Sequence, residues 1–236
     1  MILLMALSLV VSLATPVGAG DMASLGYSDE CTLIHADPDD CWITYSNNDG
    51  SFENGYAWQY AGVVPPYGGA FGEGFSGGSC GIGVVCARLW VTTLSGFYTG
   101  QSCDVYIWEG GFDNEPGAVA SMTAGVVLGN VPYWPAIGAN DVSAYGSIPG
   151  QAGGFTVGYW GDWPSAPCGY FVAADLDGPG GRPWTYIAPG IGYPTGWNDP
   201  SMVWGPTQSL GLEAEAWGGY TPAEPRTWGT VKALFD

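Results

Sequence analysis

Positively charged side chains are scarce in this chain of 236 residues. It contains 22 acidic residues but only four basic ones, Arg88, Arg182, Arg226 and Lys232, so its formal net charge is -18. Nucleic acids and anionic membrane surfaces are bound through clusters of Lys and Arg. The chain has no such cluster, and this excludes both kinds of partner. The acids are spread along the sequence, which is typical of a well-solvated surface and also supplies oxygen ligands for divalent cations.

Histidine and the familiar catalytic motifs are also missing or nearly so. His35 is the only histidine, and it lies between Cys31 and Cys41, in a segment that a disulfide would constrain. The sequence has no P-loop, no H-E-x-x-H and no G-x-G-x-x-G unit between a strand and a helix. Structural zinc is disfavoured because there is no C-x-x-C pair. No catalytic residue is predicted, and paired carboxylates of a glycoside hydrolase remain the third functional hypothesis.

Long apolar runs are confined to the start of the chain. Residues 2–14 are apolar apart from two serines, Pro16 ends the run, and Val17-Gly18-Ala19 supplies small residues for a signal peptidase. About 13 apolar residues are too few for a bilayer, which takes about 20. Residues 1–19 are therefore predicted to be a secretory signal helix, although no Lys or Arg precedes the run. A buried core helix is the alternative, and no other segment could span a membrane as a helix.

Six cysteines follow the predicted signal peptide, and an even number in an exported chain indicates three disulfides. They are Cys31, Cys41, Cys80, Cys86, Cys103 and Cys168. Proximity along the chain favours the pairs Cys31–Cys41 and Cys80–Cys86. This leaves Cys103–Cys168, the least certain of the three, to cross-link two candidate strands.

Glycine and proline are abundant, with 40 and 18 residues, while aromatic residues make up 14% of the chain. So much aromatic surface can build a core despite the many chain breakers. Short runs of β-branched and aromatic residues alternate with turn clusters, which predicts an all-β, antiparallel, jelly-roll-like sandwich of about nine strands. No crossover helices are present between the strands, so a parallel α/β fold is excluded. The expected strands cover residues 84–95, 104–109, 154–160, 168–174 and 184–188, with weaker candidates at 42–45, 56–60, 118–124 and 209–216.

The sequence predicts one main domain. Residues 20–44 form an N-terminal disulfide-containing segment, residues 45–216 form the sandwich, and residues 217–236 form a linker and a C-terminal tail. In the tail, Trp228, Val231 and Leu234 fall three residues apart. This spacing fits a short amphipathic helix, and a frayed terminus is the equal alternative.

Two acidic loops are candidate Ca²⁺ sites. The stretch YSNNDGSFENGYAW offers Asp49 and Glu53, and a later strand end offers Asp175 and Asp177. Ca²⁺ takes six to eight oxygen ligands from carboxylates, amides and carbonyls. Neither loop matches the D-x-[DN]-x-[DN]-G pattern, and Asn-Asp-Gly is also typical of a tight turn. The turn is the favoured interpretation, and Ca²⁺ is the one cofactor that the sequence suggests.

Tryptophan is common, with 12 residues. Five candidate ligand-binding tryptophans lie amid Gly, Pro and Asp: Trp160, Trp163, Trp184, Trp197 and Trp204. Exposed aromatic rings with polar neighbours suit a glycan platform. A chain with few aliphatic residues must also build its core from tryptophan. The two interpretations differ in which of the five are exposed together.

The stretch Tyr45–Trp58 resembles the Y-D-D-G-x-x-E-N-G-x-x-W opening of β-sandwich modules in secreted bacterial proteins. Further pieces follow in the same order: Val105–Trp108, Glu115–Ala118, Phe155–Tyr159 and Asp175–Gly181. The chain departs from this pattern in two ways. It has an extra residue between Tyr45 and Asp49, and it contains cysteines, which are not part of that pattern. The resemblance covers roughly residues 45–215. It implies a β-sandwich outside the cell and no shared catalytic role.

The segment Thr227–Phe235, TWGTVKALF, is similar to short W-G-x-[IV]-K-x-L-[FY] tails at the ends of other exported proteins. This similarity implies a sorting, anchoring or processing signal. The sequence as a whole predicts a non-catalytic, secreted or cell-surface bacterial protein with a role in adhesion, ligand binding or surface structure. Its partner would be a glycan or another cell-surface component. The alternative is a carbohydrate-binding module that uses exposed tryptophan and structural Ca²⁺.

Overall fold

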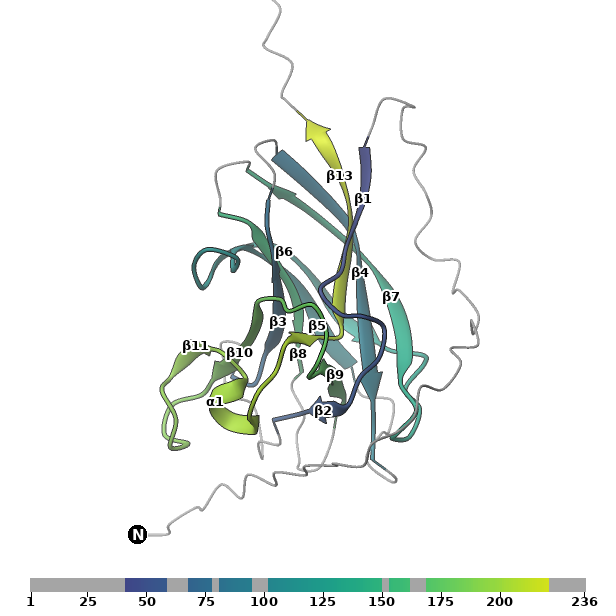
Figure 1. Ribbon diagram of the computed structural model, residues 1–236. Coiled ribbons are helices and arrows are strands. Elements are labelled where there is room, and N and C mark those ends of the chain that lie inside the picture. Colours follow the sequence, from purple (N-terminus) through teal and green to yellow (C-terminus); the bar gives the residue numbers. More distant parts are fainter. Residues whose placement is uncertain are drawn as a thin grey trace, which may run out of the picture.

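The computed structural model describes residues 41–58, 68–77, 81–94, 102–149, 153–161 and 169–220 (Figure 1). The predicted signal peptide, most of the N-terminal segment and the tail from Thr221 onward lie outside these residues. In the described part, no helix has both the length and the apolar character needed to cross a membrane.

The described strands form two antiparallel sheets, here called sheet A and sheet B, with seven and six strands. Sheet A contains β1 (Cys41–Tyr45), β13 (Leu212–Tyr220), β4 (Gly81–Thr92), β9 (Phe171–Asp175) and β12 (Ser209–Leu210), with β2 (Asn54–Tyr56) paired to β9 and β7 (Gly138–Ile148) paired to β4. Sheet B contains, in order, β11 (Gly196–Asn198), β10 (Pro183–Ile187), β3 (Phe71–Phe75), β8 (Phe155–Trp160), β5 (Ser102–Gly110) and β6 (Pro116–Val127). The predicted all-β antiparallel sandwich is therefore confirmed.

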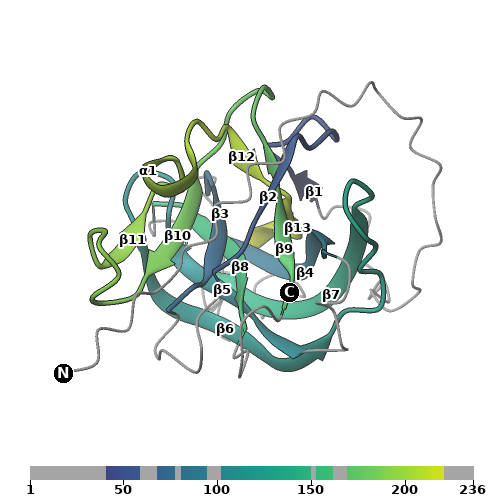
Figure 2. The same cartoon turned by 90° about the horizontal axis from the view of Figure 1, so that it is seen from below.

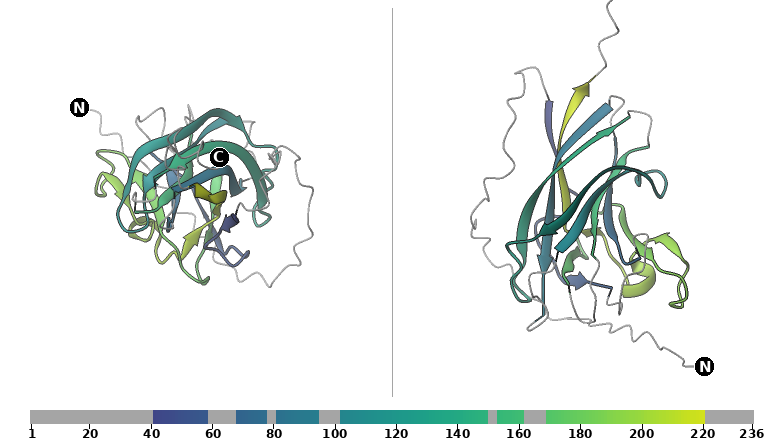
Figure 3. Two further views of the ribbon diagram at one scale, coloured as in Figure 1. Left: turned by 90° about the horizontal axis from the view of Figure 1, so that it is seen from above. Right: turned by 180° about the vertical axis from the view of Figure 1, so that it is seen from behind.

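The chain passes repeatedly from one sheet to the other, as in jelly-roll-like folds. Viewed from below, sheet B curves round from β11 to β6, and β6 comes beside β7 of sheet A (Figure 2). Figure 3 shows the same arrangement from above and from behind. The Thr123 hydroxyl on β6 donates a hydrogen bond to the Ser143 carbonyl on β7, at 3.2 Å. One open side of the sandwich is joined at this contact.

Strand alternation builds the core between the sheets. On β5, Val105 and Ile107 point inward and are fully buried, and on β7 Val142 and Ala144 do the same from the other side. Aromatic rings fill the remaining space, including Tyr45, whose ring meets Phe155 edge-on with centroids 5.0 Å apart. Aromatic side chains therefore take over much of the packing that aliphatic residues perform in other cores.

All five clearly predicted strands are present as β4, β5, β8, β9 and β10, with ends shifted by a few residues. Of the weaker predictions, 42–45, 118–124 and 209–216 correspond to β1, β6 and the β12–β13 pair, whereas 56–60 shares only Tyr56 with β2. The expected number of about nine is too low, since the sequence did not indicate β3, β7 or β11. β3 (FGEGF) is rich in glycine and carries an acid, and the outward positions of β7 are polar. A four-residue helix, α1 (Ser201–Trp204), also interrupts the strands.

The cysteines follow the prediction only in part. Cys86 is disulfide-bonded. The pairs Cys80–Cys86 and Cys31–Cys41 stay predictions, because the side chains of Cys31, Cys41 and Cys80 lie outside the described part. The predicted Cys103–Cys168 link is wrong, because Cys103 is a free thiol. Cys103 points from β5 into the core, where a thiol packs as a small apolar side chain. Burial, with a smaller effect of Asp104, raises the pKa of this thiol to about 12.

Candidate functional site

Asp175, at the end of β9, is a completely buried carboxylate that accepts hydrogen bonds from the backbone. Its Oδ1 accepts from the N–H groups of Asp177 (3.1 Å) and Gly178 (2.7 Å), and its Oδ2 accepts from the Asp49 N–H (3.0 Å). A side chain at Gly178 would collide with this carboxylate, so glycine is required there. The residue therefore ties two predicted loops together, across 126 positions of sequence.

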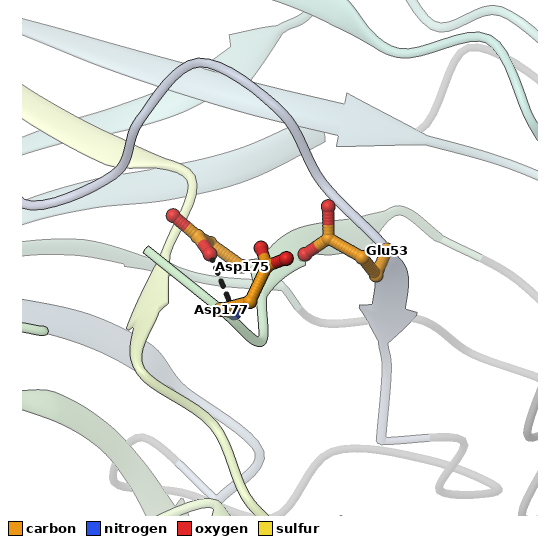
Figure 4. A group of neighbouring side chains, drawn as sticks. All are labelled: Glu53, Asp175 and Asp177. Carbon is orange, nitrogen blue, oxygen red and sulfur yellow. Dashed lines mark hydrogen bonds between the residues drawn. The ribbon is translucent and has the colours of Figure 1, made fainter. Parts of the chain in front are cut away.

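Glu53, Asp175 and Asp177 converge (Figure 4), and one carboxylate oxygen from each lies within 4.8 Å of the others. Glu53 Oε2 accepts a hydrogen bond from the Leu176 N–H at 2.9 Å. Asp49, the fourth predicted metal ligand, is not in this group. Its carboxylate accepts hydrogen bonds from the backbone and hydroxyl of Ser51, which lower its pKa.

The acidic group is explained by the turn without an ion. Three carboxylates supply only part of the six to eight oxygens that Ca²⁺ takes. Two of the three, on Glu53 and Asp175, already accept backbone N–H groups. Within the first loop, Gly50 has a positive φ of 88° and its N–H bonds to the Asn48 side chain. The favoured turn at Asn48-Asp49-Gly50 is therefore present, and Ca²⁺ binding stays a prediction.

Glu73 on β3 is a second completely buried carboxylate, and the sequence did not indicate it. Its Oε1 accepts from the Asn47 amide and the Arg182 N–H, both at 2.7 Å, and its Oε2 accepts from the Leu210 N–H at 2.8 Å. Burial raises the pKa of Glu73 to about 8, although these three donors act in the opposite direction. The carboxylate joins sheet B to β12 of sheet A and to the first loop. A lone acid in an apolar strand was the only sequence signal for it.

The aromatic residues that point away from the core gather on the outer face of sheet B. Along β5 and β10, successive side chains alternate between the core and this face. The register pairs Trp197 with Tyr186 and Trp160 with Asp104. We call this surface the aromatic face; its rings are Tyr106, Trp108, Trp160, Trp184, Tyr186 and Trp197.

Several rings of the aromatic face contact one another. Tyr106 and Trp108 stack with centroids 5.0 Å apart, and Trp197 meets Trp108 edge-on at 5.1 Å and Tyr186 at 5.3 Å. Gly72 and Gly158 face each other on the intervening strands β3 and β8. A Cβ on Gly72 would lie 2.6 Å from the Thr156 methyl group, and a Cβ on Gly158 would collide with the β3 backbone. The two glycines also place no side chain above the middle of the sheet.

Exposure differs among these rings. Trp108 and Tyr106 are 0% and 6% exposed, whereas Trp160, Trp184, Tyr186 and Trp197 are partly exposed. The indole N–H of Trp160 donates to the Gly68 carbonyl (3.0 Å) and that of Trp184 to the Gly111 carbonyl (2.7 Å). Internal hydrogen bonds therefore fix the orientation of two partly exposed rings.

Three of the five predicted ligand-binding tryptophans, Trp160, Trp184 and Trp197, thus share one face. Trp204 does not belong to it, because this residue ends α1 and packs against the core. Its ring stacks on Tyr56 at 4.7 Å and meets Trp58 at 4.8 Å. Trp163 lies outside the described residues. Sequence proximity grouped these tryptophans, but strand alternation separates Trp204 from the other three.

Comparisons with known proteins identify no family. No family model matches the chain, and no curated protein matches it. A solved structure, the crystal structure of the infectious bursal disease virus VP2 subviral particle, is similar with a TM-score of 0.31 and 13% sequence identity. The match covers 76% of this chain and 41% of that one. The fold assignment here rests on the strand pairing itself.

Proposed function

We propose that this chain is a non-catalytic, exported β-sandwich protein that binds carbohydrate on the aromatic face. The observation that carries the proposal is the gathering of partly exposed aromatic rings from β8, β10 and β11 outside the core, beside the buried rings of β5. The outward face of a sheet in an antiparallel sandwich is ordinarily polar. Rings on that side contribute nothing to the packing between the sheets, so another role is expected for them.

Aromatic rings on a sheet suit sugar ligands for physical reasons. A pyranose presents patches of C–H groups that pack flat against an indole or phenol ring, and apolar contact of this kind supplies most of the affinity of a concave or planar site. Trp160 and Trp184 are held by hydrogen bonds to backbone carbonyls, so little ordering of the protein is needed on binding. The predicted export signal and the resemblance to secreted bacterial modules support a role outside the cell.

The buried acids favour binding over hydrolysis. Glu73 is completely buried and accepts three hydrogen bonds from the protein, so its carboxylate offers no position for a substrate. Asp175 is likewise buried and accepts three backbone N–H groups. A glycoside hydrolase needs two carboxylates that both reach the scissile bond.

The test is a binding assay with insoluble cellulose, chitin and xylan, followed by soluble glycan arrays. Wild-type protein is expected to bind at least one of them, and Trp197→Ala is expected to weaken that binding by about tenfold, whereas Trp197→Phe retains most of it. Tyr145→Ala is the matched control, because Tyr145 is 58% exposed on β7 of the other sheet. Binding to no polysaccharide, or an equal loss with Tyr145→Ala, would overturn the proposal.

A further inference from the structure

Among the residues that the structure describes, the aromatic face has no charged side chain between its two ends. Asp104 lies at one end, beside Trp160, where its carboxylate accepts the Gly125 N–H at 2.8 Å. Arg182 lies at the other end, just before β10. Between them, the outward positions of β3, β5, β8 and β10 are occupied by glycine, threonine, tyrosine and tryptophan. Along the middle of this face, a ligand therefore meets no ionised side chain of the described strands.

Of the basic residues in the described part, neither is available to a ligand in the middle of the face. Arg88 lies on sheet A, where its Nε is 2.6 Å from Asp141 and its guanidinium is 3.7 Å from Glu213. Arg182 donates through Nε to the Phe112 carbonyl, and its guanidinium lies over the Phe112 ring, 5.5 Å from the centroid. Both guanidinium groups are thus held by the protein itself.

This distribution of charged side chains decides which sugars can bind. A uronate or sulfate group that approaches aromatic rings loses water, and recognition of such anions ordinarily takes a paired Arg or Lys. The chain as a whole carries a net charge of -18, which repels a polyanion before contact. A neutral sugar polymer is subject to neither effect.

We propose that the aromatic face selects uncharged polysaccharides and rejects polymers of uronic acids or sulfated sugars. This inference rests on the proposed carbohydrate function and specifies its ligand class. The partly exposed rings come from β8, β10 and β11, which together with β3 are four neighbouring strands at about 4.8 Å spacing. A surface of that width exceeds a single sugar ring, so the ligand is a chain of sugars.

The experiment compares polymers that share a backbone and differ in charge. Affinity electrophoresis of the whole protein uses hydroxyethylcellulose against carboxymethylcellulose, glycol chitin against carboxymethyl chitin, and galactomannan against polygalacturonate. Retention by at least one neutral polymer is expected, and the retention should be the same at about 20 mM and about 500 mM NaCl because no ion pair is involved. The charged partner of that polymer should bind at least tenfold more weakly.

A charge variant makes the test sharper. Met122 is 50% exposed on β6 and pairs in register with Tyr106, so its side chain lies at the rim of the aromatic face. Met122→Lys is expected to raise the affinity for carboxymethylcellulose or its carboxylated equivalent several-fold at low salt, and the gain should vanish at high salt. Tyr145→Lys adds the same charge to sheet A and should give no such gain.

The outcomes separate the two proposals. If wild-type protein binds acidic polymers as well as or better than their neutral partners, the selectivity is wrong while carbohydrate binding stands. An equal gain for Met122→Lys and Tyr145→Lys would also overturn it, because the effect would then reflect net charge rather than the face. If no polymer of either class is retained, the proposed function itself fails.

Discussion

The outer faces of the two sheets cover the same core but differ in chemistry. On sheet A, Arg88 lies between Asp141 and Glu213, and Ser143 and Tyr145 occupy the following outward positions of β7. On sheet B, the corresponding positions of β5 and β10 carry aromatic rings. The outer face of sheet A therefore carries charged and polar side chains besides Trp90 and Tyr145, whereas the outer face of sheet B is mostly aromatic. The difference identifies sheet B as the side whose surface is not explained by folding alone.

The two faces also differ in how closely their rings pack. On sheet A, Trp90 meets only Phe52 among the ring contacts described, with centroids 5.6 Å apart. On sheet B, Trp108 contacts two other rings and is 0% exposed. Between these rings, the glycines that face each other on β3 and β8 carry no side chain.

The largest effect is expected where the two sheets are joined. Glu73→Ala removes a buried acceptor that receives hydrogen bonds from three segments, and it leaves the buried Leu210 N–H and the partly buried Arg182 N–H without this partner. The free energy of unfolding should fall by about 4 kcal/mol, measured by urea denaturation. Glu115 is exposed directly before β6, so Glu115→Ala should change the free energy of unfolding by no more than about 0.5 kcal/mol. Equal midpoints for both variants would contradict a role for Glu73 in joining the sheets.

The next largest effect compares a tryptophan on each outer face. Trp108→Ala should lower the free energy of unfolding by about 3 kcal/mol, because a fully buried ring is removed from a ring cluster. Trp90→Ala removes a partly exposed ring from sheet A, so it should lower the free energy of unfolding by about half as much. Thermal or chemical unfolding of both variants gives the comparison. A larger loss for Trp90→Ala would mean that the aromatic layer on sheet B is no better packed than sheet A.

A pH effect should follow from the same carboxylate that joins the sheets. The pKa of Glu73 rises from 4.5 to about 8 on burial, so the folded state binds a proton more tightly than the unfolded chain. The resulting stabilisation is complete below about pH 4.5 and is lost as the pH rises through about 8. The free energy of unfolding should therefore decline across this range, and Glu73→Gln should flatten the decline. An identical slope in the variant would assign the pH dependence to other groups.

The smallest effect is expected at the acidic group of Glu53, Asp175 and Asp177. Two of these carboxylates already bond to backbone N–H groups, so millimolar Ca²⁺ or EDTA should leave the melting temperature unchanged. A ligand of the native state must raise stability, so a clear upward shift with Ca²⁺ would establish a metal site there. Asp177→Asn would then be expected to remove the shift.

Local patterns predicted much of the fold, and their failures have physical causes. The run Val84–Ser95 and the alternation in Asp104–Glu109 identified β4 and β5, because β-branched and aromatic residues on alternate positions suit a half-buried strand. β3 was missed because glycine provides no such signal. The even number of cysteines predicted a disulfide for Cys103, whereas its inward position on β5 makes this residue part of the core.

For the candidate site, the sequence supplied the types of residue and the structure supplied their grouping. Trp160, Trp184 and Trp197 come from three strands, and only strand register brings them to one face. Trp204 has the same sequence neighbourhood but turns inward from α1. Tyr106 and Trp108 were expected only as strand residues. Their place beside Trp197 depends on contacts between strands that are remote in sequence.

Composition and local pattern by themselves determined the β class, the turn at Asn48-Asp49-Gly50 and the absence of a cationic surface, because these depend on neighbouring residues or on simple counts. Only the tertiary structure decided that Glu73 would be buried, that Asp49 would meet Asp175, and that one sheet would carry aromatic rings on its outside. The physical reason is the separation in sequence of the residues that interact. Alternation fixes which side of a strand a residue occupies, but the pairing of distant strands fixes what it faces.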